Sequence, residues 1–231
     1  MRVVALIGDM VASRSQADRR KGQEMLQAAC ESLNNRAAEF GLLSPLTLTL
    51  GDEFQALFNH AEQVWRCVVA LEAAMAPVAI RFALGVGEIT TEINTQQALG
   101  MDGPAFYHAR DGIVALKKTG HRYTVQGLDS DGSAPLWLQP TLDLVSHQRQ
   151  KWQANRVHIL AGMMAQKPVA EMAESLGISE QAVYANIRDG ALDSIVEIFA
   201  ASSASMQAGL DEGLDEGLEE GADKITKGAC R

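Results

Sequence analysis

Residues 46–58 constrain the fold of this chain more than any other stretch. Leucine alternates with threonine over residues 46–50, which is the period-two pattern of a half-buried strand. A glycine and an acid then supply a tight turn, and apolar residues alternate again over residues 54–58. The sequence therefore predicts a β-hairpin that carries two acids, Asp52 and Glu53, at its tip.

Two carboxylates at a turn between apolar strands suit a divalent cation, because hard metals take oxygen ligands. A continuous apolar run over residues 3–7 predicts a central strand covered on both faces, and Asp9 follows it. A first strand and a central hairpin are sheet neighbours, so we expect Asp9 and Asp52 to meet at one edge. The sequence predicts Mg²⁺ or Mn²⁺ there, and two separate surface acids are the alternative interpretation.

The first part of the chain alternates strands with helices. Periodicity predicts helices over residues 17–40, 60–75 and 104–116, and strands over residues 80–86 and 122–125. Together with the hairpin they give a mixed sheet covered by helices, an α+β sandwich, within residues 1–130. Gly85 and Gly87 in one strand indicate that something approaches its backbone closely.

From about residue 137 the pattern is helical throughout. We expect helices over residues 154–166, 168–176, 179–188 and 192–200, and a linker over residues 129–135. Residues 140–200 would form a small all-α module. Residues 202–231 contain an acidic Gly-Leu-Asp-Glu repeat, and glycine at every fourth position costs about 1 kcal/mol each in a helix, so this tail is predicted to be disordered.

Residues 169–188 resemble a helix-turn-helix. Ala173 suits the close crossing of two helices, Gly177 suits the turn, and Ile178 and Val183 suit the shared core. A second set of residues would face a DNA major groove: Ser179, Glu180, Gln181, Tyr184 and Arg188. A helical bundle that serves dimerisation or partner contact is the alternative interpretation.

Charge limits how such a module would bind DNA. The formal net charge of the chain is -9, which argues against a dominant nucleic-acid surface. Residues 147–200 hold six acids against five bases, namely Arg149, Lys151, Arg156, Lys167 and Arg188. Phosphate contacts supply most DNA affinity, so a single module would bind weakly, and a homodimer would gain affinity from two half-sites.

The sequence also indicates where the protein resides. Three scattered cysteines without metal-type spacing fit a reducing compartment. The apolar run near the N-terminus is too short for a signal peptide, and no run of eighteen apolar residues occurs. We expect a soluble, cytoplasmic protein without a membrane partner.

Four blocks of sequence, in this order, resemble the SatD family over essentially residues 1–200. The blocks are IGDMVASR (7–14), TLGDEFQAL (49–57), RFALGVGE (81–88) and GMDGPAFYHAR (100–110). More distantly they resemble class III nucleotidyl cyclases and diguanylate cyclases, which implies a cyclase-like domain of ferredoxin-like βαββαβ type over residues 1–130. That resemblance implies two metal ions held by Asp9 and Asp52 on a nucleoside triphosphate, and a catalytic role for Arg110 at developing phosphate charge. It also implies a phosphate-wrapping loop made of Met10, Val11, Ala12, Ser13 and Arg14.

Three positions depart from the cyclase pattern. Phe106 replaces an asparagine, Leu48 replaces a base-reading lysine, and Leu50 replaces a glycine of the diguanylate cyclase motif. The resemblance therefore implies metal and phosphate binding without the groups that read base and sugar, and we do not assign cyclase activity. We expect a regulator in which a cyclase-like domain binds a metal–nucleotide or phosphate ligand and a helix-turn-helix binds DNA. An active Mg²⁺-dependent nucleotidyl or phosphoryl transfer enzyme, and a partner-binding scaffold, remain alternatives.

Overall fold

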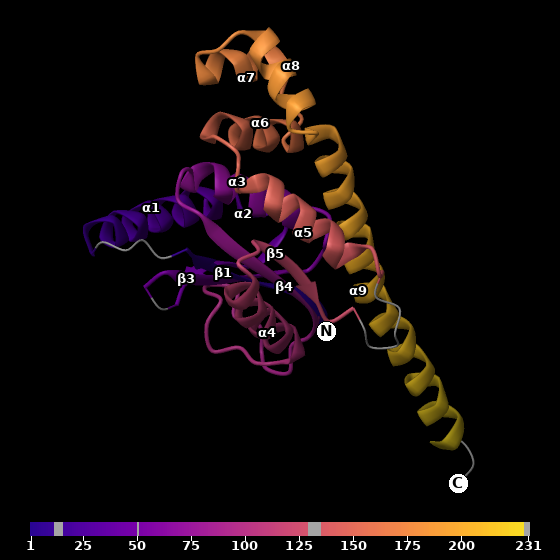
Figure 1. Cartoon of the computed structure of the whole chain (residues 1–231). Helices are drawn as coiled ribbons and strands as arrows, with labels where there is room; N and C mark the ends of the chain where they lie inside the picture. Colours follow the sequence, from indigo (N-terminus) through magenta and orange to yellow (C-terminus); the bar gives the residue numbers. More distant parts are fainter. Residues whose placement is uncertain (12–15, 50, 129–134, 229–231) are drawn as a thin grey trace.

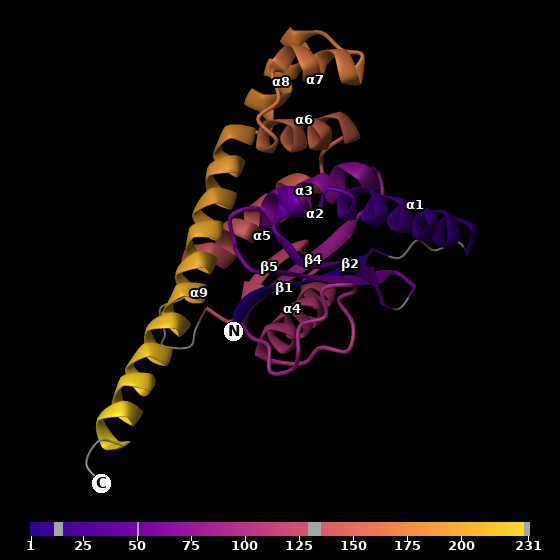
Figure 2. The same ribbon diagram turned by 180° about the vertical axis from the view of Figure 1, so that it is seen from behind.

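A five-stranded mixed sheet forms the centre of the protein (Figures 1 and 2). The structure is a computed structural model that describes residues 1–11, 16–49, 51–128 and 135–228. The strands are β1 (Arg2–Met10), β2 (Leu42–Leu48), β3 (Glu53–Phe58), β4 (Ile80–Glu88) and β5 (Tyr123–Gln126), in the order β2-β3-β1-β4-β5. β1 is antiparallel to both neighbours, and β4 and β5 are parallel. The predicted α+β class, with the hairpin of β2 and β3, is confirmed.

Helices cover both faces of the sheet. They are α1 (Gln16–Asn34), α2 (Ala37–Phe40), α3 (Val64–Met75), α4 (Pro104–Thr119), α5 (Leu138–Arg149) and α9 (Leu192–Gly228). α4 lies alone on one face, and α1, α3, α5 and α9 lie on the other (Figure 1). Alternate residues of β1 point into these two cores, Val4 and Leu6 into the larger one and Val3, Ala5 and Ile7 into the one under α4. The continuous apolar run over β1 follows from this double cover.

The predicted close approach at Gly85 and Gly87 is made by α4. A Cβ at Gly85 would lie 2.1 Å from the carbonyl oxygen of Ala105, and one at Gly87 would lie 2.7 Å from the Ala105 nitrogen. Only glycine lets the helix backbone come this close to the strand. These two glycines therefore set how near α4 and its charged side chains lie to the sheet.

The helix predicted over residues 17–40 ends early and is followed by the short α2. The Asn34 side chain accepts a hydrogen bond from the Leu46 N–H and donates one to the Leu46 carbonyl, both at 2.8 Å. Asn34 thus ties the end of α1 to the edge strand β2, and the chain turns there. The partner is remote in sequence, so helical periodicity alone does not reveal this break.

α5 lies in the stretch that was expected to be helical, although we gave it no bounds, and it packs with the sheet domain. The Arg149 side chain, 6% exposed, lies with its Nε 3.4 Å from Glu72 on α3. Tyr123 of β5 donates a hydrogen bond to the same carboxylate at 2.7 Å, and burial beside Glu72 raises the pKa of Tyr123 well above its ordinary value. The predicted domain boundary between residues 130 and 140 therefore precedes a helix that packs with the sheet domain. Residues 129–134 of the predicted linker lie outside the described residues.

Three short helices form a bundle at one end of the molecule, and the first of them packs against α3 of the sheet domain (Figure 1). They are α6 (Ala154–Met164), α7 (Val169–Leu176) and α8 (Glu180–Asp189). α5 and α9, which flank these three helices, both pack against the sheet domain, and the module bounds of 140–200 stay a prediction. Within the described chain no helix has the length and apolar character needed to cross a membrane.

α9 runs through the boundary that we placed at residue 202, and the disorder expected of the repeat stays a prediction. The helix continues from Leu192 to Gly228 (Figure 2). Met206 is fully buried and Leu210 is 5% exposed. Burial of two such side chains contributes about 2 kcal/mol each, which offsets the helix cost of the intervening glycine, about 1 kcal/mol.

Candidate functional site

Three charged residues form a row across the sheet on the face that α4 covers. Asp9 of β1 is directly opposite Glu53 of β3 and Arg81 of β4. Asp9 and Glu53 are buried, at 5% and 9% exposure. Because side chains alternate along a strand, residues in register share a face, and the three polar groups converge here beyond the apolar core.

α4 places two further cations over this row. The Arg110 guanidinium lies 2.6 Å from Glu53 Oε1, and Lys117 Nζ lies 2.8 Å from Asp9 Oδ1. Arg81 donates to the other oxygen of Asp9 at 3.0 Å. We call Asp9, Glu53, Arg81, Arg110 and Lys117 the charged array. It holds two acids and three bases, so the carboxylates are fully neutralised.

The charged array occupies the position at which the sequence predicted a metal site. Both oxygens of Asp9 already accept from cationic groups. Within the described residues, no three His, Cys, Asp or Glu side chains are grouped so as to hold a metal ion. As arranged, the residues therefore do not fit Mg²⁺ or Mn²⁺, and metal binding by Asp9 and Asp52 stays a prediction.

The structure brings Asp9 and Asp52 together through the backbone. The Met10 N–H donates to the Asp52 carbonyl at 2.9 Å, so Asp52 lies beside the end of β1 as expected. The Val11 N–H donates to the Ala79 carbonyl at 2.8 Å. The amides of Met10 and Val11 are thus occupied within the sheet and do not point at a ligand. Ala12, Ser13 and Arg14, the rest of the predicted phosphate loop, lie outside the described residues.

Two members of the charged array were not predicted from the sequence. Side chains alternate along β4, and this alternation places Arg81 on the same face of the sheet as Asp9. The face of Arg81 was therefore predictable from the pattern of residues 80–86. Lys117 is two helical turns beyond Arg110, so one face of α4 carries both. The identity of their acidic partners depends on strand order, which the local pattern does not encode.

The helix-turn-helix geometry forms as the sequence pattern predicted. Gly177 adopts a left-handed φ of 63° and ends α7, and the Ile178 N–H donates to the Ala173 carbonyl at 3.1 Å. The Ser179 hydroxyl caps α8 by accepting from the Ala182 N–H at 3.2 Å. Val183 is fully buried where α8 packs on α6 and α7.

The opposite face of α8 is exposed. Tyr184 is 57% exposed, and the Arg188 side chain is 78% exposed and forms an ion pair with the neighbouring Asp189. Glu180 and Gln181 are exposed as well, beside Ser179 at the start of the helix. The residues predicted to face a major groove thus lie together on the outside of the bundle.

Comparison with known proteins gives one family match. A family model described as the SatD family matches residues 3–194. No curated protein matches the chain.

Several solved structures show partial similarity at a TM-score of 0.35. A bacterial light-regulated adenylyl cyclase is 12% identical, and the match covers 54% of this chain and 43% of that one. The guanylyl cyclase domain of the RhoGC fusion protein from Blastocladiella emersonii is 17% identical, with 48% and 73% covered. The guanylyl cyclase Cya2 is 14% identical, with 49% and 70% covered. The chain thus spans less than half of the first of these proteins, and similarity at this level carries no argument about activity.

Proposed function

Since the chain belongs to the SatD family, we propose for it the function that its geometry supports best, a regulator that binds double-stranded DNA through α7 and α8. The observation that carries this proposal is the exposed face of α8, whose Gln181, Tyr184 and Arg188 project from a capped and internally packed helix pair. Such residues at the start and along one face of a second helix are those that reach base edges in a major groove.

The charge of the bundle sets how this binding would behave. The surrounding bases and acids nearly cancel, so few phosphates are contacted and one module binds weakly. We propose that the protein acts as a homodimer, because two modules on one duplex gain affinity by avidity. Sedimentation analysis of the full chain tests the dimer, and a monomer at every concentration would contradict it.

The DNA proposal is tested with the full chain on a pool of random-sequence duplexes. We expect retention at low salt and enrichment of a two-fold symmetric site. Arg188→Ala should weaken binding about tenfold, as expected for an arginine at a base edge or phosphate. Arg20→Ala is the matched control, because Arg20 is equally exposed at 84% but lies on α1. Equal effects of the two substitutions, or no retained duplex, would overturn the proposal.

A second proposal concerns a nucleotide or phosphate ligand of the sheet domain. Two cations of the charged array are about half exposed, Arg110 at 50% and Lys117 at 47%, at the edge where Asp52 also lies. They are placed to meet an anionic group there. A thermal-shift screen of nucleoside triphosphates, with and without Mg²⁺ or Mn²⁺, tests this binding. A shift that Arg110→Met abolishes would support it, and no shift with any nucleotide would contradict it.

The same incubations separate binding from catalysis. Cyclic or linear nucleotide products that disappear in Asp9→Ala and Asp52→Ala would favour a transfer enzyme over a regulator. If the chain binds neither nucleotide nor DNA, a partner-binding scaffold is the remaining alternative.

A further inference from the structure

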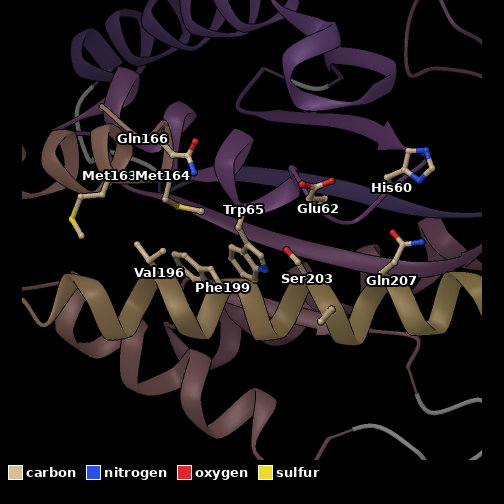
Figure 3. Close-up of a pocket in the computed structure, with 12 residues that line it drawn as sticks. His60, Glu62, Trp65, Met163, Met164, Gln166, Val196, Phe199, Ser203 and Gln207 are labelled. Atoms are coloured by element: carbon tan, nitrogen blue, oxygen red, sulfur yellow. The ribbon is translucent and has the colours of Figure 1, made fainter. Parts of the chain in front are cut away.

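A cavity of the described chain lies where the sheet domain meets the helical bundle. Its volume is about 610 Å³, within the range of small-molecule sites. Its walls come from three elements: the turn before α3, the end of α6 and the middle of α9 (Figure 3). It is remote from the charged array and from the exposed face of α8, and neither proposal above uses it.

The floor and one end of the cavity are mainly apolar, with Gln166 beside the methionines (Figure 3). Trp65 and Phe199, at 1% and 0% exposure, lie beneath the floor, and their rings stack with centroids 4.3 Å apart and an interplanar angle of 9°. Trp65 also donates a hydrogen bond to Ser202 at 3.0 Å, which fixes the indole on α9. Met163 and Met164 are only partly buried and form the wall at this end (Figure 3). Thioether side chains adapt to the shape of an apolar ligand.

The other end is polar and carries one charge. His60, Glu62 and Gln207 lie there, away from the methionines (Figure 3). Gln207 is already engaged, since it accepts from the Ala61 N–H at 3.0 Å and donates to Asp211 at 2.9 Å. Among the described residues that line the cavity there is no lysine or arginine, and Glu62 is the single acid. Glu62 has no ion-pair partner in the described part of the chain.

From this gradient we propose that the cavity binds a small amphipathic cation, with its apolar body over the Trp65–Phe199 pair and its positively charged head at Glu62. An apolar body would cover the partly exposed methionines, and an unpaired carboxylate attracts a cation in preference to an anion. The net charge of the chain, -9, also produces a negative potential that attracts a cation. This site stands independently of DNA binding and of the nucleotide proposal.

The proposal is tested by calorimetric titration of the full chain with three probes of equal apolar body. These are 4-phenylbutylamine, 4-phenylbutanol and 5-phenylpentanoate, each with a phenyl ring and four methylene groups before the polar head. We expect the amine to bind most tightly, about fivefold better than the alcohol, because one exposed ion pair contributes up to about that factor. The carboxylate should bind weakest. Equal binding of all three, or the reverse order, would overturn the assignment of a cation.

Two variants locate the site. Glu62→Gln should bring amine and alcohol within about twofold of each other, and Glu92→Gln, an exposed acid outside the cavity, should leave the difference unchanged. Ala204 lines the cavity from an exposed position on α9, so Ala204→Trp fills it without entering the core. We expect this variant to lose at least tenfold in affinity for the amine, and Ala201→Trp, exposed on α9 outside the cavity, to retain it.

Two further results would overturn the proposal. One is amine binding that Ala204→Trp leaves intact, since the ligand would then lie elsewhere. The other is a wild-type chain that binds no probe and forms a dimer that Ala204→Trp disrupts. The cavity would then be an interface between copies of the chain.

Discussion

The charged array between the sheet and α4 and the outer face of α8 both consist of polar residues on ordered elements, but their charged groups have different surroundings. In the charged array each carboxylate is paired with a cation, and Asp9 is buried at 5% exposure. On α8 the side chains of Tyr184 and Arg188 extend into solvent. Paired, buried charges mainly affect stability, whereas exposed groups that do not pack within the fold are available to contact a partner. The comparison directs stability experiments to one region and binding experiments to the other.

The largest effect is expected at the buried end of the charged array. Asp9→Asn should lower the free energy of unfolding by about 2–3 kcal/mol, because it leaves Arg81 and Lys117 without their buried partner. Urea unfolding in the presence of EDTA measures this. A metal site predicts the opposite sign without metal, since neutralising one of two adjacent carboxylates relieves repulsion. Asp52→Asn is the control and should change stability by less than about 0.5 kcal/mol, as for an ordinary surface substitution.

A smaller effect is expected at the N-terminus of α8. Ser179→Ala removes the hydroxyl that caps the helix and should cost about 1 kcal/mol. Ser179→Asp keeps a capping oxygen and should stay within a few tenths of a kcal/mol of the wild type. Thermal unfolding followed by circular dichroism measures both. A Ser179→Ala variant as stable as the wild type would show that α8 does not depend on its cap.

The exposed end of the charged array should contribute less. The Arg110 side chain is 50% exposed, so the Arg110–Glu53 pair should be worth under about 1 kcal/mol. A double-mutant cycle with Arg110→Met and Glu53→Gln isolates this coupling energy. Arg188→Met on α8 is the counterpart and should leave stability unchanged. A coupling as large as the effect of Asp9→Asn would remove the distinction between the two ends of the charged array.

The smallest effect is a pH dependence of the helical bundle. Burial lowers the pKa of His158 on α6 from its ordinary value of 6.5. The unfolded chain therefore takes up a proton at a higher pH than the folded one, so stability falls as the pH drops below 6.5 toward the folded pKa. Between pH 7 and 5 the wild type should lose more stability than His158→Gln. Parallel losses in the two proteins would assign the effect to other groups.

Local patterns in the sequence predicted the elements better than their contacts. The alternation over residues 46–58 predicted the hairpin because a strand with one face buried has period two. The turn at Gly177 and the cap at Ser179 were likewise predictable, since turn and cap chemistry acts over a few residues. The break after Asn34 was not predictable, because it depends on hydrogen bonds to Leu46 in another element.

The candidate sites show the same difference between what local patterns predict and what depends on contacts between distant elements. The sequence predicted that Asp9 and Asp52 approach each other, but not that Lys117 and Arg81 occupy the oxygens of Asp9. That outcome depends on the strand order and on how closely α4 approaches Gly85 and Gly87. The cavity above Trp65 was not predicted at all, because it is formed by three elements that are remote in sequence and meet only in the fold.

α9 begins at Leu192, directly after the Gly190-Ala191 turn that ends α8, and its buried Ile195, Phe199 and Met206 fix its rotation on the sheet domain. Each residue of a helix advances the chain by about 100° around its axis. One alanine inserted ahead of Ile195 would therefore swing Arg188 a quarter-turn or more about α9, whereas seven would restore its direction and displace it by about 10 Å. The number of residues between the turn and Ile195 thus sets the direction in which α8 points from the sheet domain.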